Sequence, residues 1–171
     1  NSRTFPDMDR LGEMVFLSSE VARLARISLR QLQWWDERKL VSPRQEGRKR
    51  FYVPEQVLEI LTVAALRQKG ISLQNVRRIL RLLRRGLGHQ ASNVRSANAK
   101  LYLVTDGNSV FIEDQPEKIL NRLGDADRPM YLVSLSEQMK RIACEEAPRR
   151  YRSKQLPLFN RSGGLIRKVS G

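Results

Sequence analysis

Apolar side chains recur every three or four residues in two short stretches near the start of the chain. In residues 18–25 they lie on one helical face, and the serines that open the stretch carry hydroxyls suited to an N-cap. Ser28 offers a second N-cap, and Leu32 and Trp35 mark the buried side of the residues after it. The pattern predicts two short amphipathic helices joined by a tight turn at Arg26.

The next segment changes to an extended, basic pattern. Pro43 disfavours helical geometry in the residue before it, so the second helix must end by then. Gly47 can adopt a positive φ, and residues 51–53 are aromatic and β-branched. Residues 43–53 therefore predict a small hairpin, with a basic tip at residues 48–50.

Two longer helices follow the hairpin. Pro54 suits a first helical position and Gly70 a helix end, and Ser72 offers the next N-cap. The second of these helices carries arginines on its polar flanks. They are Arg77, Arg78, Arg81, Arg84 and Arg85. A solvated face and a set of phosphate contacts explain this cluster equally well.

The second half of the chain has a different organisation. Residues 86–100, rich in Gly, Ser, Asn and Ala, predict a linker, and 101–145 alternate strand and helix signals in the order ββαβα. Residues 146–171 form a basic stretch that we expect to be a flexible tail, and 1–15 a flexible lead-in. The predicted fold class is α+β, a mostly helical module at 16–85 with a small β hairpin, followed by the ββαβα domain.

Composition narrows the function. A formal charge of +14 and a pI near 10.8 favour a polyanionic partner, with nucleic acid ahead of an anionic membrane because no apolar stretch approaches the roughly 20 residues of a membrane span. Cys144 and His89 are the only residues of their kinds, so we expect no disulfide framework, zinc site or other cofactor. The scattered carboxylates form no acid–base pair, and we expect no enzyme but a soluble, cytoplasmic, nucleoid-associated protein.

Residues 16–83 resemble the DNA-binding domain of the MerR family of bacterial transcription regulators, with features of its heat-shock-repressor branch. The matching segments stand in the family's order. They are Ser19-Glu20-Val21-Ala22, Ile27-Ser28-Leu29-Arg30-Gln31-Leu32-Gln33-Trp34-Trp35-Asp36, Lys39-Leu40-Val41-Ser42-Pro43, Arg50-Phe51-Tyr52 and Gly70-Ile71-Ser72-Leu73. The resemblance implies a winged helix-turn-helix.

The same resemblance implies how the module binds double-stranded DNA. The second helix, residues 28–38, would enter the major groove, and the wing, residues 43–53, would lie on flanking phosphates. The expected DNA-binding residues are Ser18, Ser28, Arg30, Gln31, Gln33, Trp34, Arg38, Arg48, Lys49, Arg50 and Tyr52. Arginine can pair with guanine and glutamine with adenine at the groove edge.

The sequence also departs from the family pattern. Arg26 stands where the family usually has a glycine, and Gln33 where it usually has an arginine, which puts one backbone contact in doubt. Family members usually continue into a long helix that makes an antiparallel coiled-coil dimer, whereas here the helix is expected to stop near Gly86. We therefore expect residues 101–145 to provide dimerisation, ligand sensing or a partner contact.

We expect a homodimeric regulator with RNA polymerase as a further partner, and the sequence leaves two alternatives open. The same winged fold would serve an architectural, recombination-accessory or partition-type protein. The tail residues Gln155, Leu156, Leu158 and Phe159, with Pro157 among them, resemble the pentapeptide by which bacterial replication and repair proteins dock on the sliding clamp. That resemblance implies an adaptor tethered through 155–159.

Overall fold

The computed structural model describes residues 14–89, 100–145 and 149–150. Its helices are α1 (Ser18–Ala25), α2 (Leu29–Glu37), α3 (Pro54–Gln68), α4 (Leu73–His89), α6 (Pro116–Gly124) and α7 (Leu135–Ala143). Its strands are β1 (Met14–Leu17), β2 (Arg44–Glu46), β3 (Lys49–Tyr52), β4 (Tyr102–Thr105), β5 (Val110–Glu113), β6 (Tyr131–Ser134) and β7 (Arg149–Arg150). The clamp-like residues 155–159 lie outside the described part of the chain.

The first two helices form where the apolar spacing predicts them, but α1 is capped differently. Its N-cap is Leu17, whose amide donates to the Glu20 carboxylate at 2.7 Å, so the serine hydroxyls expected there do not cap it. At α2 the prediction is confirmed, since the Ser28 hydroxyl accepts from the Gln31 amide at 3.0 Å. The turn between them passes through Arg26 at φ 55°, a left-handed conformation that favours glycine.

The β2–β3 hairpin is confirmed at residues 44–52 and extends into a larger sheet. Gly47 takes φ 58° at its tip, and the strand order is β2-β3-β1-β7. β1 begins at Met14, so the expectation that residues 1–15 form a lead-in is wrong for its last two positions. Within the expected tail, residues 149–150 pair with the other edge of β1. An edge strand offers unpaired backbone groups that a later segment can satisfy.

The two long helices confirm the predicted starts and one predicted end. Pro54 opens α3, and Gly70 at φ 84° follows its end, where the Ile71 amide returns to the Leu66 carbonyl at 3.2 Å. α4 runs to His89, three residues beyond the expected stop near Gly86. Gly86 lies inside α4, where an added Cβ would overlap the Ile112 side chain of β5. Gly86 looked like the end of the helix in the sequence, but in the structure its missing side chain allows α4 to approach β5 closely.

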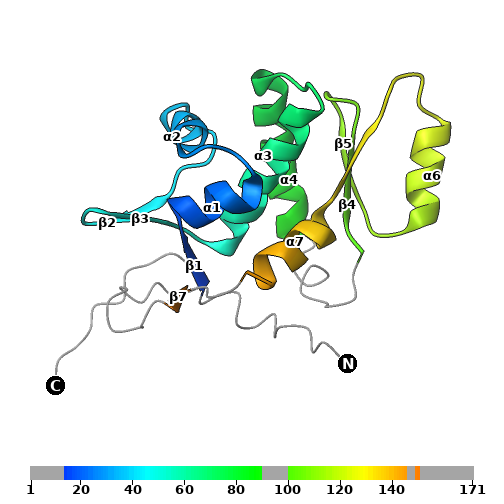
Figure 1. The fold of residues 1–171 in the computed structure, drawn as a ribbon. Helices are drawn as coiled ribbons and strands as arrows, with labels where there is room; N and C mark the ends of the chain where they lie inside the picture. The colour runs from blue at the N-terminus through cyan, green and yellow to red at the C-terminus, as the bar shows by residue number, and fades with distance from the viewer. Residues whose placement is uncertain (1–13, 90–99, 146–148, 151–171) are drawn as a thin grey trace, which may run out of the picture.

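The order ββαβα is confirmed in residues 102–143. β4 lies between β5 and β6 in an antiparallel sheet, and Gly107 takes φ 91° in the β4–β5 turn. One face of the sheet packs toward α3, α4 and α7, and α6 lies on the side away from α1 and α2 (Figure 1). α7 continues directly from β6, with the Ser134 hydroxyl accepting from the Glu137 amide at 3.2 Å.

A continuous core connects the two halves of the chain. One cluster of buried side chains contains Leu61 and Val63 of α3 together with Leu103, Leu135 and Ile142 from the ββαβα part. The Thr62 hydroxyl of α3 donates a buried hydrogen bond to the Gln138 side-chain oxygen of α7 at 3.0 Å. The Arg141 guanidinium also donates to the carbonyl of Leu24 in α1. The ββαβα elements therefore complete the core of the helical module.

Candidate nucleic-acid interface

Helix α2 divides sharply into a buried and an exposed side. Leu32 and Trp35 are 1% and 2% exposed and anchor the helix in the core, as predicted. On the other side Arg30 and Gln33 are exposed, and Trp34 retains 36% of its surface. Because residues 30, 33 and 34 are spaced by three and four, the exposed side presents one row of side chains.

Two side chains of this row already have partners in α2 or at its C-cap residue. The Gln33 amide donates to the Glu37 carboxylate at 3.0 Å, and the Arg38 guanidinium lies 5.1 Å from the centre of the Trp34 ring. Both contacts are at the surface, where such interactions are worth about 1 kcal/mol or less, so they can be exchanged for contacts to a ligand. Arg30 keeps its five donors free of any protein partner in the described structure.

The β2–β3 hairpin lies on the same side of the molecule as α2 (Figure 1). Arg48 and Lys49 are exposed at the tip, and Arg50 reaches back to the Asp36 carboxylate of α2 at 3.4 Å. The exposed basic side chains of α2 and the hairpin thus form one surface, which we call the basic face. It comprises Arg30, Arg38, Arg44, Arg48, Lys49 and Arg50.

Tyr52 does not belong to the basic face. It is 2% exposed, so the expectation that it contacts DNA is wrong, because the strand pairing of Tyr52 with Phe16 directs it into the core. Burial, reinforced by the nearby Asp36 carboxylate, raises the pKa of Tyr52 to about 12. Ser18 forms a hydrogen bond with this buried tyrosine and is itself partly exposed at the start of α1.

Two arginines of α4 make hydrogen bonds within the fold that the sequence did not predict. Arg77 donates to the Arg38 carbonyl at 2.6 Å, at the end of α2. Arg84 donates to both carboxylate oxygens of Glu59, at 2.7 and 2.8 Å, and to the Leu40 carbonyl at 3.2 Å. These bonds satisfy the carbonyl of Arg38, the C-cap residue of α2, and the carbonyl of Leu40 in the segment after it. Sequence spacing gave no signal for them, because the partners lie 39 and 44 residues away.

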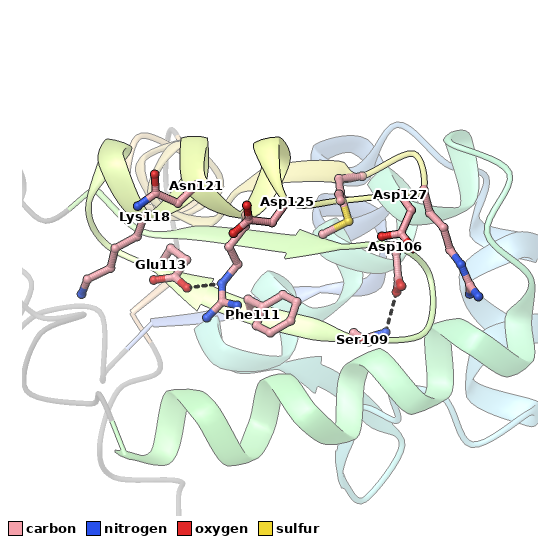
Figure 2. A pocket seen from close by; sticks show the side chains of 12 residues that line it. Asp106, Ser109, Phe111, Glu113, Lys118, Asn121, Asp125 and Asp127 are labelled. Carbon is pink, nitrogen blue, oxygen red and sulfur yellow. Dashed lines mark hydrogen bonds and ion pairs between the residues drawn. The ribbon is translucent and has the colours of Figure 1, made fainter.

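Acidic side chains of the ββαβα part serve turns and ion pairs. The Asp106 carboxylate accepts from the amides of Asn108 and Ser109, and the Ser109 amide above all lowers the pKa of Asp106. Glu113 pairs with Arg122 at 2.6 Å, and that guanidinium lies over the Phe111 ring (Figure 2). The described residues contain no group of three or more His, Cys, Asp or Glu arranged to hold a metal ion.

Comparison with known families gives the basic face its context. Residues 16–83 match the family model described as MerR HTH family regulatory protein. These residues form a MerR-family domain. The match covers α1, α2, the hairpin, α3 and most of α4, and the heat-shock-repressor branch stays a prediction. A search of curated proteins with the chain returns no significant match.

The match of residues 16–83 to this family model indicates the kind of partner. MerR-family regulators are DNA-binding proteins rather than enzymes, and a MerR helix-turn-helix domain implies double-stranded DNA as its ligand. None of the helices in the described residues is both long and apolar enough to cross a bilayer. A double-stranded DNA ligand for this domain also agrees with the excess of basic over acidic residues in the chain.

Proposed function

We propose that the chain is a sequence-specific, double-stranded DNA-binding transcription regulator, in which residues 28–38 enter the major groove and residues 43–53 form a wing on flanking phosphates. The observation that carries this proposal is the exposed row of α2 beside a basic hairpin on the same side of the molecule. A helix anchored by Leu32 and Trp35 presents that row rigidly, which positions side chains better than a loop does.

Base recognition falls to the exposed row of α2 and to the partly exposed Gln31 next to it. Arg30 pairs with the groove edge of a guanine, and Gln31 and Gln33 pair with adenines, with Gln33 exchanging its bond to Glu37 for the base. Ser28 and the first amides of α2 face a phosphate, because the N-terminus of a helix favours an anion. The Trp34 indole N–H donates to a second phosphate.

Backbone contacts fall to the hairpin and to the flanks of α2. Arg48 and Lys49 neutralise phosphates from the tip of the wing, and Arg50 and Arg38 do so closer to the helix. Ser18 donates to a phosphate at the start of α1. These contacts supply affinity and salt dependence rather than sequence preference.

The regulator binds as a homodimer to a pseudo-palindromic site in the nucleoid, with one α2 helix in each half-site. Two copies double the phosphate contacts and the number of bases that are read. If the bound dimer blocks a promoter, it represses transcription. If it distorts the promoter DNA beneath RNA polymerase, it activates transcription.

The test is the selection of bound fragments from random duplex DNA, using the full chain and single variants. Arg30→Ala is expected to relax preference at one position and to cost about 1–3 kcal/mol there. Lys49→Ala is expected to weaken all sequences alike and to lower the slope of log K against log salt by about 1. Lys118→Ala, on the far side of the molecule, serves as the control and leaves both quantities unchanged.

Two results would contradict the proposal. If no sequence is enriched, the module is an architectural or recombination-type binder rather than a regulator. If Lys49→Ala changes the preferred sequence and Arg30→Ala does not, the roles of helix and wing are exchanged.

A further inference from the structure

Leu29 is a large apolar side chain that the fold leaves exposed at the start of α2. It lies three residues before Leu32, which is the spacing of the buried side of this helix, yet 54% of its surface is exposed, against 1% for Leu32 and 2% for Trp35. Among the described residues, Leu29 belongs neither to the core cluster nor to the side chains that pack against it. Packing within the described part of the chain therefore does not account for a leucine at this position.

Capping of α2 does not account for Leu29 either. Ser28 is the N-cap, and its hydroxyl accepts from the Gln31 amide at 3.0 Å. In a hydrophobic staple the residue before the N-cap packs against the fourth helical residue. Those positions are held here by Ile27, which packs against the core, and by Leu32 within it. Leu29 occupies the first helical position and takes part in neither arrangement.

The start of α2 is suited to approach DNA. Among the described helices only α2 and α4 carry no acidic residue in the first turn, whereas α1, α3, α6 and α7 each have a glutamate there. A phosphate is therefore not repelled from the first amides of α2, which favour an anion. In helix-turn-helix proteins the N-terminal residues of the second helix contact base edges. On the proposed function, Leu29 thus enters the major groove.

The neighbour of Leu29 on the helix surface indicates the base that it meets. Gln33 lies four residues further along α2, so the two side chains are adjacent on its surface. An amide side chain can pair with adenine in the major groove, and the apolar group that a base pair presents there is the C5-methyl of thymine. Leu29 and Gln33 together therefore match the two kinds of group that A·T pairs present.

We propose that Leu29 packs against the C5-methyl group of a pyrimidine in the major groove, which in unmodified DNA is thymine. This inference rests on the proposed function and adds an apolar contact to the hydrogen bonds assigned to Arg30 and Gln33. 5-Methylcytosine presents the same methyl group at the same place, so the contact is made with either base. Hydrophobic burial of one methyl group corresponds to a change in affinity of about 3- to 10-fold.

The experiment uses the full chain and the duplex sequence that it selects from random DNA. Deoxyuridine, which differs from thymidine only in lacking the C5-methyl group, replaces each thymidine in turn, and Kd is measured for each duplex. For the wild type, Kd is expected to rise about 3- to 10-fold at one thymine position. Leu29→Ala is expected to bind both duplexes equally at that position. Leu120→Ala, which shortens an exposed leucine of α6, is the matched control and keeps the wild-type ratio.

A second comparison separates the two sources of the methyl group. Cytosine and 5-methylcytosine are placed in turn at the same position, opposite guanine in both duplexes. The wild type is expected to bind the 5-methylcytosine duplex about 3- to 10-fold more tightly than the cytosine duplex, and Leu29→Ala to bind the two equally. Equal binding of these two duplexes by the wild type would restrict the contact to thymine and overturn the wider assignment to methylated pyrimidines.

Three outcomes decide the matter. If the wild type selects a sequence in which no thymine responds to loss of its methyl group, the assignment of Leu29 is overturned and the proposed function stands. If the methyl effect persists in Leu29→Ala, the assignment is also overturned, because another side chain must then make the contact. If no sequence is selected at all, the proposed function fails and the role of Leu29 fails with it.

Discussion

Arg26 and Tyr52 show how much single positions depend on their surroundings. Arg26 occupies a left-handed turn that a glycine would adopt without strain, so the departure from the family pattern costs stability. Tyr52 has the polar hydroxyl of a DNA-contacting residue, but its strand register buries it. Local chemistry predicted the turn at Arg26 and failed for Tyr52.

Arg26→Gly is expected to raise the free energy of unfolding by about 0.5–1 kcal/mol, because relief of strain exceeds the extra entropy of glycine in the unfolded chain. Urea denaturation measures the change. Arg30→Gly, inside α2, is the control and lowers the same quantity by about 1 kcal/mol. A loss of stability in Arg26→Gly would mean that the Arg26 side chain contributes more than its backbone strain costs.

Deprotonation of Tyr52 is expected to lower the stability of the fold at alkaline pH. The folded chain holds the phenolic proton up to a pKa of about 12, whereas the unfolded chain releases it near the ordinary value of 10.0. Stability from this group is therefore complete below pH 10 and falls as pH rises toward 12, by roughly 2 kcal/mol. Unfolding of wild type and Tyr52→Phe at several pH values measures it, and equal slopes in the two proteins would refute the assignment.

At the scale of elements, α4 fastens the segment that follows α2. Arg77 and Arg84 bind carbonyls of residues 38 and 40, and Glu59 of α3 holds Arg84 in place. For these two side chains the structure shows a third arrangement, hydrogen bonds within the fold, which the sequence did not predict. These contacts hold the end of α2 and the segment after it in place.

Arg84→Lys is expected to destabilise the fold by about 1 kcal/mol, because lysine cannot supply the planar fork that meets both oxygens of Glu59. Arg85→Lys, an exposed neighbour on the same helix, changes stability by less than about 0.5 kcal/mol. Thermal unfolding of both variants gives the comparison. Equal effects would show that the Arg84 contacts contribute no more than a solvated side chain.

At the scale of the whole molecule, the division into a module at 16–85, a linker and a domain at 101–145 understates how the parts depend on each other. α7 packs against α3, and Arg141 and Gln138 reach α1 and α3 from the ββαβα part. The buried side chains form one cluster across both halves. We expect them to unfold together.

Leu135→Ala tests this cooperativity. Leu135 is fully buried at the start of α7, so the change is expected to cost about 2–5 kcal/mol. Both tryptophans of the chain lie in α2, so tryptophan fluorescence reports on α2 alone. Its midpoint should fall together with that of circular dichroism. A fluorescence midpoint that stays at the wild-type value would show that the halves unfold separately.

The sequence by itself determined the helices, both hairpins, most of the caps and the family. These signals are local, because apolar spacing, a capping serine or a glycine at positive φ acts within a few residues. The exposed row of α2 was predictable for the same reason.

Only the tertiary structure decided which side chains remain on the basic face and what completes the core. Tyr52, Gly86, Arg77 and Arg84 owe their roles to partners from other elements of the fold, and no local pattern encodes those distances. The pairing of β1 with residues 149–150 is likewise set by an open strand edge rather than by the pattern of either segment. The role of each of these residues depends on its burial and on its partners in other elements, because the free energy of a contact depends on which side chains the fold places around it.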